Sequence, residues 1–560
     1  MDLRHPYLTE QLIAYIGNKR ALLPFLHEVL VDLVPDASRA TFLDPFAGTG
    51  AVSRLARLMG FDVAANDWEA YAYAINSCHL GMNASDLGPL FSRFGGMDAV
   101  LAELNALPPP DEDREYISRH YAPRNTATAD WRTERLFYTR ENALAIDAIR
   151  DRVEEMFPGA LDSGPASPVK AALLAPLLYE AATHTNTSGV FKACHRGFGG
   201  HGADALSRIM APIRMRRPRL IDAAKRGTVR CGEAQVFLRG RTADVCYLDP
   251  PYAVHQYGSN YFMLNSIALW DRPPVSAERG TDGRLLKKAG IRQDWTRTRS
   301  AFCHPATAAA PMRETLRCAD CRWIVLSYSD EGVIGLEELC DILAAEGSLS
   351  VRSTGYVKYP GGKQSMKRTI RNQELAFVVD RRRAPRALPA GPLLAEVRLG
   401  RLLSGSYHPD RIRAAFPVVG DAIAPAGCGA RLFMRHFWRF RDVSTVFPDS
   451  AGRESFLSAL SECAVRDARE EIDVLVSIVE AEPDPRERRA LQRQILTLLN
   501  RIAHRKYSRP FSETLGRLRS VPWLEGAEPF FRAGLQAAAV KAERRFAANT
   551  RSLPTPRSAP

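Results

Sequence analysis

A glycine-rich turn between an apolar segment and a helical segment constrains the fold of this chain more than any other feature. The run TFLDPFAGTG ends an expected strand at Asp44, and Gly48 and Gly50 permit the tight turn that follows. In the next residues, AVSRLARLMG, apolar side chains recur at a helical spacing, and FDVAAND is a second short strand that ends at Asp67. This order predicts the βαβ unit that begins a doubly wound sheet.

Three more apolar runs are typical of buried strands. They are ADVCYLDPPY, CRWIVLSYS and NQELAFVVD. Because helical stretches separate them, they predict a mostly parallel α/β sheet of the Rossmann-like type. The roughly 150 residues between the second and third strands exceed any ordinary loop and contain stretches such as NALAIDAIRDRVEEMF. They predict an inserted, mostly helical subdomain.

The last strand is followed by a Pro- and Arg-rich run, RRRAPRALPAGP, which is typical of a linker. The residues after it have helical patterns. The expected boundaries are 11–81 and 233–380 for the sheet domain, 82–232 for the inserted subdomain, 381–392 for the linker, 393–546 for a basic helical C-terminal domain and 547–560 for a disordered tail.

Positive charge is concentrated in two parts of the chain. The formal net charge is +13, and residues 381–560, with 31 basic and 19 acidic side chains, carry +12 of it. Within the nearly neutral remainder, residues 192–230 hold 10 basic and 2 acidic side chains. This asymmetry favours a polyanionic partner, most simply nucleic acid, although an arginine-rich solubilising surface would give the same counts.

Composition excludes several other classes of protein. With 46% apolar and 25% charged residues, the chain is typical of a globular protein, and no stretch approaches the ~20 apolar residues of a membrane helix. The N-terminal run MDLRHPYLTE has no apolar signal-peptide core, so we expect a cytoplasmic protein without membrane association. Cys318 and Cys321 form a C-x-x-C pair without a second pair, which favours structural cysteines and no metal.

Two strand-end motifs carry groups suited to chemistry. Asp67 is placed either to bind ribose hydroxyls or to cap the helix that follows it. Asp249-Pro250-Pro251-Tyr252 follows the apolar run VCYL, and its prolines fix the backbone so that a carboxylate and a carbonyl point to one place. With the tyrosine ring, these groups suit a planar ligand that carries an exocyclic amine. The alternative is a Pro-rich turn with a capping Asp.

The motifs and their order resemble those of the Dam-like, alpha-group DNA methyltransferases, which use S-adenosylmethionine to methylate adenine N6. YIGNKRALLPFL, residues 15–26, resembles the group's N-terminal motif, and it is followed by the cofactor loop DPFAGTG, a downstream Asp, a long insertion and DPPY. LSYSDEG and KYPGGKQSMKRTIRNQELAFVV resemble the group's next strand-end motif and its last hairpin. The resemblance covers residues 11–380.

The resemblance implies a set of cofactor-binding residues. Lys19 would hold the methionine carboxylate, Asp67 the ribose, and Glu233, where the group usually has Asp, would lie near the adenine of the cofactor. The full set implied for S-adenosylmethionine is Tyr15, Lys19, Asp44, Phe46, Gly48, Gly50, Asp67, Glu233 and Asp249.

It also implies catalytic and DNA-binding residues. Asp249 and the carbonyl of Pro250 would accept hydrogen bonds from the target amine and favour its developing positive charge, while Tyr252 would stack on the flipped base. The candidate DNA contacts are Lys192, Arg196, Arg214, Arg216, Arg217, Lys363, Lys367, Arg368 and Arg371. A solvated basic hairpin is the alternative for the last four.

The expected function is site-specific methylation of adenine N6 in double-stranded DNA. It would serve restriction–modification, with a cognate restriction endonuclease, or epigenetic marking. A cytosine-N4 DNA methyltransferase and an inactive DNA-binding protein on the same fold stay open as alternatives, and so does the oligomeric state.

Two further features each allow two interpretations. Tyr261 and Phe262, after DPPY, would line the base pocket or pack as ordinary helix residues. RLFMRHFWRFRD places Arg431, Arg435 and Arg439 four apart, which on a helix makes one basic ridge. That ridge would contact the DNA backbone, or belong to a core helix whose arginine stems lie along its surface.

Overall fold

The computed structural model of the chain contains two compact units. It describes residues 1–161, 167–199, 205–357, 371–386, 397–400, 402–426, 428, 431–441, 450–503 and 507–547. The first unit comprises Met1–Gly361 and Glu374–Ala390, and the second comprises Gly362–Gln373 and Gly391–Pro560. Each unit has its own sheet and its own hydrophobic core. None of the helices in the described ranges is both long and apolar enough to cross a membrane.

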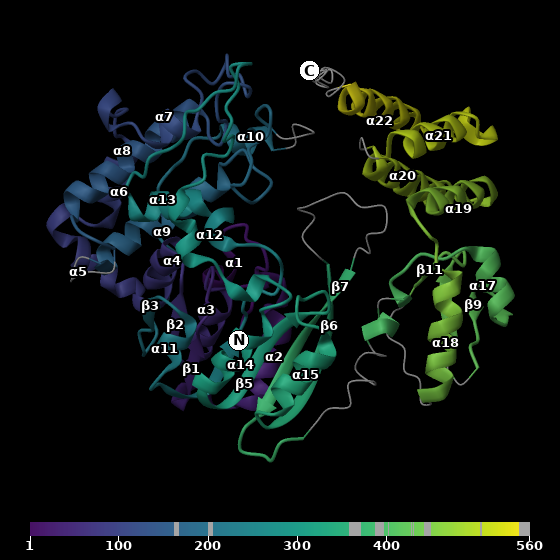
Figure 1. Cartoon of the computed structure of the whole chain (residues 1–560), viewed down its shortest axis with the longest axis horizontal. Coiled ribbons are helices and arrows are strands. Elements are labelled where there is room, and N and C mark those ends of the chain that lie inside the picture. Colours follow the sequence, from purple (N-terminus) through teal and green to yellow (C-terminus); the bar gives the residue numbers. More distant parts are fainter. Residues whose placement is uncertain are drawn as a thin grey trace, which may run out of the picture. The chain divides into compact units, whose positions relative to one another are not determined.

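A seven-stranded sheet forms the centre of the first unit (Figure 1). Its strands lie in the order β3 (Thr228–Cys231), β2 (Asp62–Asp67), β1 (Thr41–Asp44), β4 (Thr242–Leu248), β5 (Asp320–Ser329), β7 (Arg371–Asp380) and β6 (Ser348–Val357). The strands from β3 to β5 are parallel, and β7 is antiparallel to β5. The expected mostly parallel α/β sheet is therefore confirmed.

The order of the strands reverses between β1 and β4, which are neighbours although about 200 residues separate them in the sequence. Ligands of doubly wound sheets bind beyond the carboxyl ends of the strands at such a switch point. The DPFAGTG turn follows β1 and the DPPY segment follows β4. The topology therefore places both motifs at one edge of the sheet.

Helices pack against this sheet. Those that flank it are α1 (Pro6–Thr9), α2 (Leu23–Leu33), α3 (Ala51–Met59), α4 (Ala70–Gly81), α11 (Ala234–Leu238), α12 (Tyr257–Asn260), α13 (Phe262–Leu269), α14 (Ala309–Cys318) and α15 (Leu336–Ala344). One core joins α1, α2 and α3 to the sheet through buried residues such as Leu26, Leu55 and Val245. This burial fixes the helix that begins directly after the glycine turn.

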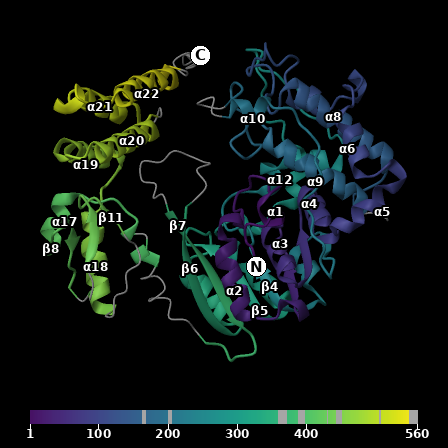
Figure 2. The same ribbon diagram turned by 180° about the vertical axis from the view of Figure 1, so that it is seen from behind.

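The segment from residue 82 to 232 is mainly helical, as expected. Its helices are α5 (Leu87–Phe91), α6 (Met97–Asn105), α7 (Ile117–Tyr121), α8 (Arg140–Met156), α9 (Ser167–Thr183) and α10 (Leu206–Met210). They form a layer on the β3 side of the sheet (Figures 1 and 2). The helices α5 to α9 share one hydrophobic core with α4 and α13, and the whole segment belongs to the first unit. Their boundary as a target-recognition subdomain stays a prediction.

The second unit differs from the expected helical domain. It contains a four-stranded antiparallel sheet in the order β11 (Arg439–Phe440), β10 (Leu432–Arg435), β9 (Ala422–Ile423) and β8 (Val418–Val419). Its helices are α17 (Pro409–Ala415), α18 (Ser450–Cys463), α19 (Ala468–Ala481), α20 (Pro485–Ile502), α21 (Ser508–Arg519) and α22 (Pro529–Ala547). The described residues from α18 onward are mainly helical, whereas the helical prediction is wrong for residues 418–440, which contain the four strands.

The predicted arginine ridge is wrong because its segment forms a hairpin. β10 and β11 are joined by a turn in which His436 and Phe437 have φ angles of 52° and 53°. Leu432 and Met434 are buried while Phe433 between them is 50% exposed, which is the two-residue alternation of a strand. The arginines and aromatic residues at every other position hid this alternation in the sequence.

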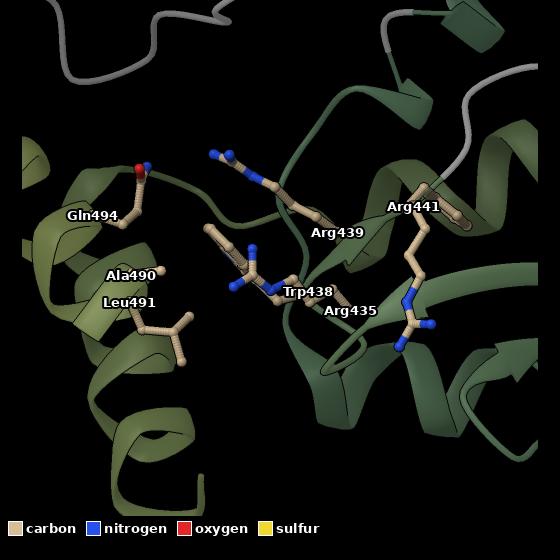
Figure 3. A pocket seen from close by; sticks show the side chains of 8 residues that line it. Arg435, Trp438, Arg439, Arg441, Ala490, Leu491 and Gln494 are labelled. Carbon is tan, nitrogen blue, oxygen red and sulfur yellow. The ribbon is translucent and has the colours of Figure 1, made fainter. Parts of the chain in front are cut away.

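The hairpin arginines join the sheet to the helices of this unit. Arg435 and Arg439 lie opposite each other, and they pair with Glu487 of α20 and Glu471 of α19, respectively. The two arginines, together with Arg441, line a pocket between the hairpin and α20 (Figure 3). Since carboxylates already neutralise Arg435 and Arg439, the structure favours a structural role for them over contact with DNA.

The glycine turn gives a test of the fold. Gly50 has a φ of +76°, and a Cβ added there would lie 2.1 Å from Asn76 Oδ1. Gly50→Ala should therefore destabilise the protein by about 1–3 kcal/mol, measured by urea unfolding. Gly88→Ala is the control, because nothing lies within 4 Å of a Cβ at that helical position. Equal stability of the two variants would mean that the turn tolerates a side chain at position 50.

Candidate functional site

The end of β2 is bonded to the glycine turn. Asp67 Oδ2 accepts a hydrogen bond from the backbone N–H of Gly48 at 2.8 Å, and Oδ1 accepts one from Glu69 N–H at 2.9 Å. Glu69, not Asp67, occupies the N-cap position of α4, so the capping interpretation of Asp67 is wrong. Burial raises the pKa of Asp67. The predicted contact of this carboxylate with a ribose stays a prediction.

Asp44 and Phe46 belong to the same turn. The Asp44 carboxylate is buried, accepting a hydrogen bond from Ser53 Oγ at 2.5 Å and one from Phe46 N–H at 3.3 Å. Burial raises the pKa of Asp44 to about 7. The Phe46 ring is half-buried and packs edge-on against Phe302. The contacts of Asp44 thus shape the turn, and its predicted cofactor contact is untested.

Glu233 lies beside Asp67 at the end of β3. Gly232 N–H donates to the backbone oxygen of Asp67 at 3.0 Å, and Glu233 is the exposed N-cap residue of α11. Two large apolar side chains near these acids are exposed. Val236, three residues after Glu233, is 63% exposed, and Trp68, directly after Asp67, is 36% exposed. Neither was expected from the sequence. A tryptophan directly after a strand-end acid is the signal that could have found Trp68.

Lys19 binds the DPPY motif. Its ammonium lies 2.8 Å from Asp249 Oδ1, 3.3 Å from Glu374 Oε1 and 3.1 Å from the Tyr252 hydroxyl oxygen. It also donates to the carbonyl of Gly17 at 3.2 Å. The Lys19 side chain is 4% exposed, so these acceptors replace its water. The predicted contact with the cofactor carboxylate is untested, and in this structure the ammonium already has four acceptors for three protons.

The electrostatics of this cluster follow from burial and charge. Burial lowers the pKa of Lys19, but Asp249 and Glu374 outweigh it and raise that pKa well above its usual value. For Asp249, burial raises the pKa, Lys19 lowers it and Glu374 raises it, and the result is about 6. The ammonium therefore stays charged at neutral pH, while the Asp249 carboxyl ionises just below neutral pH.

Tyr15 connects the N-terminal motif to the turn and to the helix after DPPY. Its ring stacks on Tyr261 with centroids 4.7 Å apart, and its hydroxyl bonds that of Tyr71 at 3.0 Å. A Cβ on Gly48 would lie 3.2 Å from the Tyr15 ring. The Tyr261 hydroxyl accepts a hydrogen bond from Ile16 N–H at 2.8 Å. Tyr261 is thus part of the wall that holds the N-terminal motif.

Phe262 lies in the hydrophobic core of the first unit. It is fully buried and packs against Tyr121 and Phe137 in the core shared with the helical layer. It is therefore an ordinary helix-packing residue rather than a wall of the base pocket.

Two buried carboxylates of the site were missed in the sequence. Glu374 of β7 is 3% exposed and contacts Lys19. An acid directly before the apolar run LAFVV is the sequence signal that could have found it. Glu69 is 4% exposed, accepts a hydrogen bond from Asn265 Nδ2 and has its pKa raised by burial to about 7. No sequence pattern distinguishes Glu69 from an exposed first-turn acid.

The predicted DNA contacts of the inserted segment are exposed. Lys192, Arg196, Arg214, Arg216 and Arg217 all lie on the surface, and Arg217 forms a two-pronged ion pair with Asp98. Lys363, Lys367 and Arg368 lie outside the described residues, and Arg371 begins β7.

Lys192 and Arg196 lie on one loop that starts near the DPPY side of the site. Phe191 N–H donates to Asn260 O at 2.7 Å. The Lys192 ammonium lies close enough to Cys303 to oppose the rise that burial causes in the pKa of that thiol. Further along the loop, the Arg196 guanidinium lies 4.5 Å from the centre of the Trp131 ring.

A second loop brings more cations to Trp131. Lys288 Nζ lies 5.6 Å from the Trp131 ring centre and the Arg132 guanidinium 5.1 Å. Buried Arg135 holds this loop, because its guanidinium donates to the carbonyls of Ser276 at 2.6 Å and Lys288 at 3.1 Å. Trp131, Arg132, Arg196 and Lys288, here called the Trp131 cluster, therefore form a basic and aromatic surface from three segments.

Comparison with known proteins identifies a matching family and several relatives. The family model of the D12 class N6 adenine-specific DNA methyltransferases matches residues 15–282. The type II methyltransferase M.NlaIII of Neisseria lactamica is 30% identical over 354 residues, which is 62% of this chain and 93% of that protein. No solved structure matches the chain.

Other relatives are longer than the matched part. The modification methylase LlaI of Lactococcus lactis subsp. lactis is 27% identical over 63% of this chain, and M.FokI of Planomicrobium okeanokoites is 26% identical over 60% of it. The chain spans 52% of LlaI and 47% of M.FokI.

The matched residues contain the glycine turn, Asp67, Asp249 and Tyr252, which the fold brings to the switch point of the sheet. This chain belongs to the D12 class of N6 adenine-specific DNA methyltransferases.

Proposed function

We propose that this protein transfers a methyl group from S-adenosylmethionine to the N6 amine of a flipped adenine in a specific DNA sequence. The observation that carries the proposal is the arrangement of the DPPY motif. Lys19 contacts Oδ1 of Asp249 at 2.8 Å, and no described residue donates a hydrogen bond to Oδ2. A free carboxylate oxygen next to a proline carbonyl and a tyrosine ring suits an exocyclic amine on a planar base. Family membership favours adenine over cytosine N4.

The residues around the glycine turn fit S-adenosylmethionine. Gly48 and Gly50, with φ of +52° and +76°, form the tight turn that leads into α3, where a Cβ would meet Tyr15 and Asn76, respectively. Asp67 supplies acceptor oxygens for ribose hydroxyls, and Trp68 and Val236 offer exposed apolar surface for the adenine of the cofactor. S-adenosylmethionine, when bound, supplies an electrophilic methyl group on a positively charged sulfur.

The chemistry of the chain's own residues is electrostatic. An adenine amine is a poor nucleophile because its lone pair is delocalised into the ring. Asp249 Oδ2 and the Pro250 carbonyl would accept its two N–H groups, which favours a pyramidal nitrogen and stabilises the positive charge that develops on it. Tyr252 would stack on the base and offset part of the few kcal/mol that base flipping costs. No covalent enzyme intermediate is needed.

The Trp131 cluster and Lys192 are proposed to bind the DNA backbone beside the flipped base. In the part of the chain that the structure describes, Arg196 and Lys288 have no carboxylate partner, so their charge is available to phosphates. The Trp131 ring holds the Arg196 guanidinium in place through a cation–π contact. Phe191 of the loop that carries Lys192 and Arg196 donates its N–H to the backbone oxygen of Asn260, the last residue of α12, which links this loop to the segment after the DPPY motif.

The biological role is proposed from the relatives. Their names describe modification methylases and type II methyltransferases. We therefore propose that this protein acts in restriction–modification in the cytoplasm, on double-stranded DNA, together with a cognate restriction endonuclease.

Asp249→Ala tests the chemistry. The variant should lose at least 100-fold in turnover, on the order of what removal of one preorganised charge-stabilising group costs. It should still fold, because Lys19 keeps Glu374 as an ion-pair partner. Transfer of labelled methyl groups to DNA measures the first effect and circular dichroism the second. Asp320→Ala, at an exposed strand start, is the control; near-normal turnover of Asp249→Ala would refute the proposed role.

Arg196→Ala and Lys288→Ala test the DNA surface. Each should weaken DNA binding and reduce the slope of log affinity against log salt by about 0.9, because each removes one phosphate contact. Fluorescence anisotropy at several salt concentrations measures both effects. Arg39→Ala is the control, because Arg39 is 89% exposed and lies just before β1, at the opposite edge of the sheet. A salt slope that all three variants leave unchanged would count against this surface.

Truncation tests the second unit. We propose that the basic C-terminal part strengthens DNA binding without contributing to the chemistry, because it carries +12 of the net charge. A chain that ends at Arg383 should keep cofactor binding, bind DNA more weakly and have a shallower salt slope. Unchanged DNA affinity would instead indicate a structural or partner-binding module.

A further inference from the structure

Glu374 is a buried acid that none of the site motifs contains. It lies on β7 opposite Ser329 of β5, next to the point where β5 reaches the catalytic edge of the sheet. Its side chain is 4% exposed. Its Oε1 atom is 3.3 Å from Lys19 Nζ and accepts a hydrogen bond from the Tyr252 hydroxyl at 3.4 Å. Glu374 therefore contacts two members of the site, Lys19 and Tyr252.

The cluster contains one basic side chain, Lys19, and two acidic ones, Asp249 and Glu374. Lys19 and Asp249 alone would be a neutral pair, and burying a second carboxylate beside them carries a desolvation cost that one shared ammonium offsets only in part. The cluster as built, with Lys19, Asp249 and Glu374 ionised, has a net charge of −1 in a buried place. A neutral residue at position 374 would avoid this cost, so the extra charge points to a task in the reaction.

We propose that Glu374 is a positioning residue for methyl transfer. It holds the Lys19 ammonium on the Oδ1 side of Asp249, which leaves Oδ2 for the target amine, and it makes the site net negative. The inference rests on the proposed function and extends it to the last strand of the sheet. Glu374 acts through Lys19 and Tyr252 and does not itself touch the base.

The geometry explains both effects. Lys19 lies between the two carboxylates, 2.8 Å from one and 3.3 Å from the other, so each restrains it. Without the pull of Glu374, the ammonium would move toward Asp249 and compete with the amine for its second oxygen. As the C–S bond of the donor breaks and the N–C bond forms, positive charge passes from sulfur to the target nitrogen. A site of net charge −1 stabilises the charged nitrogen better than a neutral one.

The charge of Glu374 also controls when Asp249 is ionised. Burial raises the pKa of Asp249, Lys19 lowers it, and Glu374 raises it again. Removing Glu374 should therefore lower this pKa, and removing Lys19 should raise it. The ionisable groups that face Asp249 from all neighbouring elements are Lys19, Glu374, Tyr252, Tyr247, Tyr257 and Asp44.

The test is the pH profile of turnover with saturating DNA and donor. In the wild-type protein turnover should fall as pH drops through about 6, since Asp249 must be ionised to accept a hydrogen bond. Glu374→Gln should reduce turnover at pH 8 by roughly tenfold or more with little change in KM, and should move the acidic limb to lower pH. Lys19→Met should move that limb to higher pH, and Glu374→Asp should restore part of the turnover.

Glu346→Gln is the matched control. Glu346 pairs with Arg381, after the other end of β7, so its loss removes an ion-paired carboxylate at the opposite edge of the sheet. Glu346→Gln should leave the acidic limb of the pH profile of turnover unchanged. An unmoved limb in Glu374→Gln, or limbs that move in the same direction in Glu374→Gln and Lys19→Met, would overturn the proposal. So would a loss of turnover that Glu374→Asp does not relieve.

A second test of the proposal measures stability and does not depend on methyltransferase activity. A double-mutant cycle of Glu374→Gln and Asp249→Asn, followed by thermal unfolding at pH 5 and pH 8, reports whether the two carboxyls are coupled. The coupling should be larger at pH 8, where Asp249 is ionised, and additivity at both pH values would overturn the proposal. If wild-type protein transfers no methyl group to any DNA while the coupling is present, the proposed function fails and the arrangement of charges stands.

Discussion

One buried ammonium group joins the parts of the site. Lys19 belongs to the N-terminal motif, Asp249 follows β4 and Glu374 lies on β7, so its contacts connect segments that are more than 200 residues apart. Loss of the Lys19 ammonium would leave two buried carboxylates uncompensated, and breaking a buried ion pair in this way costs about 3–5 kcal/mol. The N-terminal motif is therefore held to the catalytic edge by charge, and by the stacking of Tyr15 on Tyr261.

The second constraint is the reversal of strand order between β1 and β4. It brings the turn after β1 and the DPPY segment after β4 side by side, as the switch point of a doubly wound sheet does. Asp67 adds a bond from β2 to the turn through Gly48. On the proposed function, the sites of the methyl donor and of its acceptor would share this edge, which is the arrangement that an in-line transfer between two bound molecules needs.

Basic side chains have different partners in the helical layer and in the second unit. Around Trp131, cations from three segments gather; Arg132 pairs with Asp130, while Arg196 and Lys288 pair with no carboxylate among the described residues, which suits a polyanion. In the second unit, Arg435 and Arg439 pair with helix glutamates and hold a hairpin in place. Arginines therefore differ in their partners between the two regions, and the positions of the acids distinguish them.

The sheet, the glycine turn and the DPPY motif could be predicted from the sequence, because strand periodicity, positive-φ glycines and proline rigidity are local properties. The order of those motifs was also enough to indicate the family. The contact of Lys19 with Asp249, the place of Glu374 in the site and the meeting of cations from two loops at Trp131 became visible only in the folded chain. The same is true of the hairpin at residues 432–440. These features depend on which segments pack together, and burial and charge pairing between distant residues leave no periodic signal in a single sequence.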